Sequence, residues 1–160
     1  MIVADAGPII VFVRIGRLAL LQQIVETVVI PDAVYDELVI AGHGRPGAEE
    51  ISQSVWIQNE SIRDPRATQH FSDILAQGEK EAILLAEERQ ATLLLDDQRA
   101  RQESRNRGIE VVGVLWVLGE AKRRGFVTEV RPIIDELLAV GYWLHPERVI
   151  RPFLEEMGEA

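Results

Sequence analysis

Short apolar runs rich in β-branched residues alternate along the chain with longer segments in which apolar residues recur every three or four positions. The first pattern is typical of buried strands and the second of amphipathic helices. The expected strands are residues 1–4, 27–30, 55–58, 92–95 and 110–112. The expected helices are residues 6–13, 17–25, 32–41, 78–89, 97–107, 114–124, 128–140 and 146–157, and residues 65–77 also favour a helix.

This alternation predicts an α/β fold, a three-layer α/β/α sandwich with helices on both faces of a central parallel sheet. The 160 residues, 47% of them hydrophobic, suit a single domain spanning residues 1–160. The C-terminal helices, about 128–157, are expected to pack on the body of that domain. The last one carries an apolar stripe that calls for a partner surface, formed by Val149, Ile150, Phe153, Leu154 and Met157.

Composition removes several classes of site. The chain has no cysteine, which excludes disulfides, zinc–thiolate sites and thiol nucleophiles. Its three histidines, His43, His70 and His145, are far apart and show no metal-binding spacing. The first apolar run contains Asp5 and no basic leader precedes it, so no signal peptide is expected. No apolar stretch approaches the roughly 20 residues of a membrane helix. We therefore expect a cytoplasmic protein.

The net charge of −9 speaks against nucleic acid as a partner, because phosphate binding depends on Lys and Arg. Two details weaken this objection. Fifteen of the seventeen basic residues are arginines, which suit bidentate phosphate contacts. Between Gln98 and Gly125, seven residues are basic and only three acidic. A solvated helix face would explain the same residues.

Candidate chemistry lies at two strand ends. The first strand is followed by Asp5, and the LLLDD run ends in Asp96 and Asp97. Ligands of open α/β sheets bind at the carboxyl ends of the strands, so these acids are expected near one another. Asp5 and Asp97 could also serve only as helix N-caps.

Helix geometry adds two glutamates. On the helix from Asp32, Glu37 borders the apolar stripe, whereas Asp36 points away from it. On the helix from Gly78, Glu79 lies in line with the apolar face and Glu81 lies off it. A glutamate in a first turn could merely compensate the helix dipole, but one that faces inward needs a partner or a cation. Four converging carboxylates with only oxygen ligands favour Mg²⁺ or Mn²⁺, which would support phosphodiester hydrolysis.

The order D-x-G-P-I-I, Glu37, GEKEAILLA and LLLDDQRAR resembles the PIN-domain nucleases, in particular the branch of toxin nucleases from type II toxin–antitoxin pairs (VapC-like). The resemblance implies that Asp5, Glu37, Glu79 and Asp97 bind the metal. It leaves Glu81 and Asp96 as helpers of those ligands. Two positions depart from the family pattern, since Gly7 stands where Ser or Thr is common and Glu79 replaces the usual Asp.

The same resemblance implies a single-strand-specific endoribonuclease that cleaves single-stranded RNA, forms a homodimer and is blocked by a small antitoxin protein. Two other enzyme classes fit less well. An aspartyl-phosphate phosphatase needs a second acid at Gly7, and a receiver domain needs an early acidic pair and a late strand-end lysine, whereas Lys122 lies in a predicted helix. The remaining alternative is a catalytically inactive PIN-like module for antitoxin binding or dimerisation.

Overall fold

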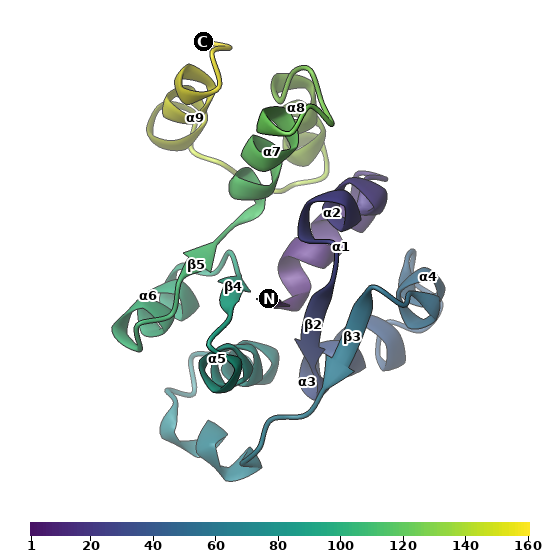
Figure 1. Cartoon of the computed structure of the whole chain (residues 1–160), viewed down its shortest axis with the longest axis vertical. Coiled ribbons are helices and arrows are strands. Elements are labelled where there is room, and N and C mark those ends of the chain that lie inside the picture. Colours follow the sequence, from purple (N-terminus) through teal and green to yellow (C-terminus); the bar gives the residue numbers. More distant parts are fainter.

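The computed structural model describes residues 1–160, and its centre is a sheet of five strands in the order β3-β2-β1-β4-β5 (Figure 1). Every neighbouring pair of strands is parallel. The strands are β1 (Ile2–Ala4), β2 (Val28–Pro31), β3 (Ile57–Glu60), β4 (Thr92–Leu94) and β5 (Val111–Val112). They consist largely of buried Val, Ile and Leu, as expected for a parallel sheet covered on both faces.

The strand order reverses between β1 and β4. From β1 the chain proceeds to β2 and β3 on one side, and it then returns to place β4 and β5 on the other. Ala4 at the end of β1 is level with Leu94 at the end of β4. The residues that follow these two strands therefore meet at the carboxyl edge of the sheet, where the reversal of order opens a crevice in folds of this kind.

Alternate strand residues point into two separate cores. Ala4 and Leu94 contribute to a core under one group of helices, whereas Val3 and Leu93 contribute to a core under α5 and α6. The helices on the first side are α1 (Ala6–Arg14), α2 (Leu18–Val25), α7 (Val114–Arg123), α8 (Arg131–Ala139) and α9 (Arg151–Glu156). On the second side lie α5 (Gln77–Arg89) and α6 (Gln98–Asn106). The predicted three-layer sandwich is thus confirmed.

The segment after β2 differs from the single helix expected over 32–41. It begins as α3 (Asp32–Tyr35) and continues as a π-helical turn, η1 (Asp36–Ile40). The wide turn brings the Leu38 carbonyl to 2.5 Å from the position that a Cβ of Gly42 would occupy, so this close approach requires glycine. A short helix, α4 (Ala48–Gln53), follows the loop and was not predicted.

Two further segments also depart from the prediction. Within residues 65–77, Pro65–His70 form a 3₁₀ turn, η2, and only Gln77, the first residue of α5, is α-helical. The last helix begins as a π turn, η3 (Pro146–Ile150), before α9. No helix combines the length and the apolar character that crossing a membrane requires.

Glu159 ties α9 to the start of α8. Its carboxylate accepts hydrogen bonds from the backbone N–H groups of Val130 (2.9 Å) and Arg131 (3.0 Å), and from Lys122 Nζ (2.7 Å). Burial raises the pKa of this carboxyl, but the bonds from Lys122, Val130 and Arg131 outweigh it and hold the pKa below its usual range. One side chain therefore fixes three elements of the C-terminal region.

Glu159→Ala is expected to lower the free energy of unfolding by about 1–3 kcal/mol, because it leaves the N–H of Val130 without its partner. Denaturant titration measures the change. The matched control is Glu156→Ala at the end of α9, three residues before Glu159, where the side chain is exposed and its only ion pair, to Arg123, is long at 3.9 Å. Equal losses in the two variants would contradict a capping role for Glu159.

Candidate active site

Asp5 emerges from the centre of the sheet with its carboxylate available. Its backbone N–H donates to the Leu94 carbonyl at 3.1 Å, which joins the ends of β1 and β4. It occupies the N-cap position of α1, yet its side chain makes no capping hydrogen bond to that helix. The interpretation of Asp5 as a simple helix cap is therefore wrong, and its side chain faces the carboxyl edge of the sheet.

Glu37 lies near Asp5, and both carboxylates approach Gly78 in the first turn of α5. A Cβ built on Gly78 would lie 3.5 Å from Asp5 Oδ1 and 3.6 Å from Glu37 Oε2, and 3.3 Å from Val34 Cγ2. Two carboxylates, from β1 and η1, thus converge on one glycine in the first turn of α5. From the sequence, Gly78 was predicted only to begin a helix. That its missing side chain leaves room for both carboxylates was not predicted.

Glu79 and Asp97 form a second pair. Glu79 Oε1 accepts from the Ala76 N–H at 2.8 Å, and Asp97 Oδ1 accepts from the Ala100 N–H at 2.9 Å, so each caps the start of its own helix. The two side chains are also neighbours. Burial raises the pKa of Glu79, the Ala76 N–H lowers it, and both the charge of Asp97 and a hydrogen bond with it raise it again. Capping and a place in the cluster are therefore compatible.

The two pairs belong to one acidic cluster, which we define as Asp5, Glu37, Glu79 and Asp97. Burial raises the pKa of Asp5 to about 7, the Ala6 N–H opposes this, and the charges of Glu79, Glu37 and Asp96 raise it further. Every charged group that acts on Asp5 is an acid. The fold therefore concentrates negative charge around Asp5, and no basic side chain offsets its raised pKa.

Asp96 lies beside the cluster, and its carboxylate is fixed by a backbone N–H at the start of α7. Its Oδ1 accepts from the Val114 N–H at 3.3 Å. Burial raises the pKa of Asp96, while the side chain of Tyr142, the Val114 N–H and the guanidinium of Arg101 lower it. Tyr142 and Arg101 were not identified from the sequence, because Tyr142 is remote along the chain and Arg101 is one of several arginines on α6.

Glu81 stands outside the acidic cluster. Its Oε1 accepts from the Ala33 N–H at 3.1 Å, and its Oε2 accepts from Gln77 Nε2 at 2.9 Å. The first bond joins α5 to the first turn of α3, and the second lies within α5, so both oxygens are engaged. Since α3 leads into the turn that carries Glu37, Glu81 can position that residue but does not face the other acids.

The cluster consists of two pairs rather than a closed ring. No three His, Asp or Glu side chains are gathered tightly enough to hold a metal ion in this conformation. Asp5 and Glu37 approach each other across Gly78, and Glu79 contacts Asp97. These four side chains are nevertheless the ones from which a metal site could be built. Asp96 lies near them, with Oδ1 bonded to the Val114 N–H and Oδ2 buried without a hydrogen-bond partner.

Asp5→Asn is expected to stabilise the metal-free protein at neutral and alkaline pH. The raised pKa of Asp5 means that its ionisation costs stability. The cost is absent below pH 3.8, grows up to about pH 7 and is complete above it. At about 1.4 kcal/mol per unit, the difference is on the order of a few kcal/mol. Denaturant titrations at several pH values in EDTA should show the wild type losing stability over this range relative to Asp5→Asn.

The exposed Asp36 of η1 supplies the control for this measurement. Asp36→Asn removes an acid from a neighbouring surface position without relieving the cluster, so its pH profile should follow that of the wild type. If Asp5→Asn and the wild type gave parallel profiles, the interpretation of Asp5 as a carboxylate crowded by other acids would be refuted.

Comparison with known proteins places this geometry in a family. A family model described as a PIN domain (DUF3368) matches residues 1–159. Among solved structures, the chain resembles a PilT N-terminus domain protein, SSO1118, from the hyperthermophilic archaeon Sulfolobus solfataricus P2. The TM-score is 0.57 at 16% identity, over 76% of this chain and 93% of that one. At this identity the likeness concerns the fold. No curated protein matches. Because the family model covers nearly the whole chain, the protein belongs to the PIN-domain family, whose fold is of the nuclease type.

Proposed function

We propose that the protein is a metal-dependent endoribonuclease that cleaves single-stranded RNA. The observation that carries this proposal is the acidic cluster at the point where the strand order reverses, with four carboxylates from four different segments and only acids among the charged groups that act on Asp5. Membership of the PIN-domain family supports nuclease chemistry at this place. The metal, the RNA and the requirement for a single strand are parts of the proposal.

The donor set fits a divalent cation. Asp5, Glu37, Glu79 and Asp97 offer only carboxylate oxygens, which suit Mg²⁺ or Mn²⁺. The high pKa of Asp5 has the same implication, because its main causes are burial and the charges of other acids, and a bound cation would offset both. When bound, the metal would activate a water molecule and neutralise charge on the scissile phosphate.

The acidic residues would have different roles at the metal site. Asp5 and Glu37, which make no helix-capping bonds with their carboxylates, would bind the cation most directly. Glu79 and Asp97 each keep one oxygen on a backbone N–H, so the other oxygen has a fixed direction. Asp96 stays anchored to Val114 and adds negative charge beside Asp5. The loss of a proton from Asp5 would accompany metal binding below neutral pH.

The proposal extends to the biological setting. We propose that the chain is the toxin of a type II toxin–antitoxin pair, acts in the cytoplasm as a homodimer, and is silenced by a small antitoxin protein. The resemblance to VapC-like toxins supports these statements. Gly7, the residue that departs from the family pattern, has open space where a side chain would be.

An inactive PIN-like module that binds an antitoxin or dimerises is the second candidate. It is favoured by the engagement of Glu79 with the Ala76 N–H and by the lack of three acids closed around one point. The two candidates differ in what they predict for metal binding. A nuclease must bind Mn²⁺ at one defined place, whereas an inactive module has no need to do so.

We expect Mn²⁺ to support cleavage of single-stranded RNA by the antitoxin-free protein, and excess EDTA to abolish it. Asp5→Asn and Asp97→Asn should each reduce the cleavage rate at least about 100-fold, because each removes a charge on which the cation depends. Asp36→Asn is the control and should cleave like the wild type. Circular dichroism establishes that the variants are folded.

Weak, nonspecific Mn²⁺ binding by the wild type, unchanged in Asp5→Asn, would decide for the inactive module. Cleavage that survives both substitutions would show instead that the activity belongs to a contaminant or to another site. Isothermal titration with Mn²⁺ separates these outcomes because it does not depend on a substrate.

Gly78→Ala tests the place of the metal independently of any charge. The added methyl group would contact Asp5 and Glu37 at ordinary distances and Val34 more tightly. Alanine gains about 1 kcal/mol of helix propensity over glycine, so unfolding should change little. We expect at least about tenfold weaker Mn²⁺ binding by calorimetry, because the methyl group fills space between the two carboxylates. Unaltered Mn²⁺ affinity would exclude this pair as metal ligands.

A further inference from the structure

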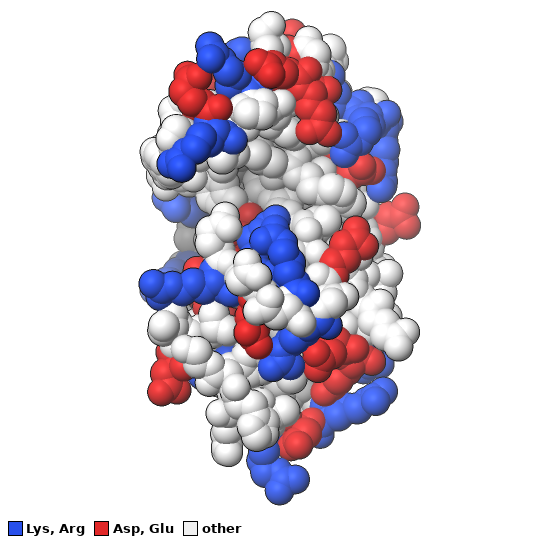
Figure 2. Space-filling model, turned by 90° about the vertical axis from the view of Figure 1, so that its left-hand side faces the viewer, with Lys and Arg blue, Asp and Glu red and all other residues white.

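A groove of about 660 Å³ begins at Asp96 and runs between α6, β5 and residues 142–149. It lies on the side of the molecule that carries α6 (Figure 1). Viewed from that side, basic side chains gather near the middle of the face, next to a hollowed area of uncharged side chains (Figure 2). Asp96, which lines this end of the groove, also raises the pKa of Asp5 through its charge, so the groove begins beside the acidic cluster.

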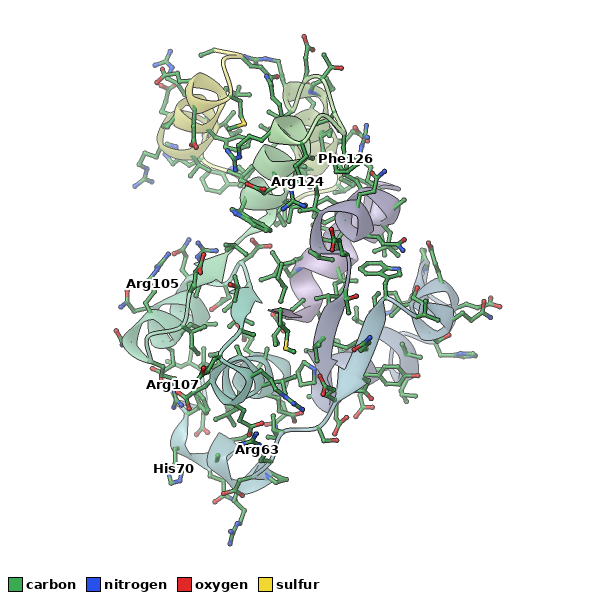
Figure 3. All side chains as sticks on the ribbon, in the orientation of Figure 1. Arg63, His70, Arg105, Arg107, Arg124 and Phe126 are labelled. Carbon is green, nitrogen blue, oxygen red and sulfur yellow. The ribbon has the colours of Figure 1, made fainter.

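Two guanidinium groups line the groove close to Asp96. Arg101 Nη1 donates to the Leu95 carbonyl at 2.7 Å, which fixes its side chain at the end of β4. Arg105, one turn further along α6, makes no ion pair and no side-chain hydrogen bond (Figure 3). Burial and the nearby charge of Arg105 lower the pKa of Arg101, so the two cations repel each other. An anion bound between them would relieve that repulsion.

Arg105 contributes positive charge that no acid pairs with, in a protein whose net charge is −9. Its neighbour on α6, Arg107, is paired with Glu87 and Glu103. The acid in the groove, Asp96, accepts from the Val114 N–H and forms no ion pair with Arg105. The groove is therefore a basic lining within an acidic protein, which suits a negatively charged ligand.

Aromatic rings form the opposite wall. Trp143 is 72% exposed. Its ring packs edge-to-face with that of His145, with 5.6 Å between the ring centroids. Trp116 and Tyr142 add half-buried rings to the same lining. An exposed indole beside free guanidinium groups is the combination that binds single-stranded nucleic acids, in which bases stack on aromatic rings and cations follow the phosphates.

We propose that this groove binds the single-stranded RNA substrate next to the site of cleavage, with an unpaired base stacked on Trp143 and the backbone phosphates on Arg101 and Arg105. The inference rests on the proposed function and adds to it the residues that select a single strand. A paired base cannot offer its face to Trp143 because that face is already stacked within the duplex. The start of the groove at Asp96 would lead the bound strand to the acidic cluster.

The test measures RNA binding apart from cleavage. Fluorescence anisotropy of a short labelled oligouridylate in EDTA reports the dissociation constant of the full-length protein. Trp143→Ala should raise it roughly tenfold, the loss typical of one base–aromatic stack, and Trp143→Phe should restore most of the affinity. Arg105→Gln should weaken binding several-fold and reduce the salt dependence of log Kd by about one unit of slope.

Matched substitutions elsewhere control for the loss of a ring or a charge. Phe126, 46% exposed in the loop after α7, and Arg63, in the loop before η2, both lie away from α6 (Figure 3). Phe126→Ala and Arg63→Gln should bind RNA like the wild type. The same oligonucleotide annealed to its complement should bind weakly and to the same extent in the wild type and in Trp143→Ala.

Each remaining outcome overturns the inference in a distinguishable way. If the wild type cleaves RNA with Mn²⁺ but Trp143→Ala and Arg105→Gln bind it normally, the groove is not the substrate site and the proposed function stands. If Trp143→Ala instead changes the mass of the protein in sedimentation and leaves RNA binding unchanged, the groove is a contact between proteins. If the wild type neither binds nor cleaves RNA, the proposed function fails together with the inference.

Discussion

The mutual repulsion of the carboxylates at the carboxyl edge of the sheet is the constraint on which the rest of the site depends. The parallel register of β1 and β4 sets Asp5 beside the LLLDD segment, and the packing of α5 on α3 brings Glu37 and Glu79 to it. No single residue would be informative alone. Backbone hydrogen bonds and two apolar cores bring the four acids to one edge of the sheet, despite the repulsion between their like charges.

Much of this arrangement could be predicted because it depends on strong periodic signals. The buried strands are nearly continuous runs of Val, Ile and Leu, and their alternation with helices leaves few possible topologies. The segment from Asp32 was predicted less well, since a constant 100° per residue does not describe the π turn at Asp36–Ile40. α4 was missed because six residues with only two buried apolar positions carry too little periodicity.

At the site, the sequence could indicate which acids lie at the carboxyl edge of the sheet, but not that Glu37 and Asp97 remain exposed there or what else the acids bind. Whether a residue lies at a strand end or on a given helix face depends on local geometry. Such positions made Asp5, Glu37, Glu79 and Asp97 the candidate ligands. The bond from the Ala33 N–H to Glu81 depends on tertiary packing, whereas the bonds of Glu79 to Ala76 and of Glu81 to Gln77 are local to the start of α5. Contacts such as that of Tyr142 with Asp96 join residues with no sequence relation, so no local pattern could reveal them.

Asp96 is coupled by charge to both parts of the proposed site, since it raises the pKa of Asp5 on one side and has its own pKa lowered by Arg101 at the head of the groove on the other. Occupancy of the two places must therefore be thermodynamically linked. An anion that draws Arg101 away from Asp96 would free that carboxylate to interact with a cation at the cluster, and by reciprocity the cation would alter the affinity for the anion by the same factor.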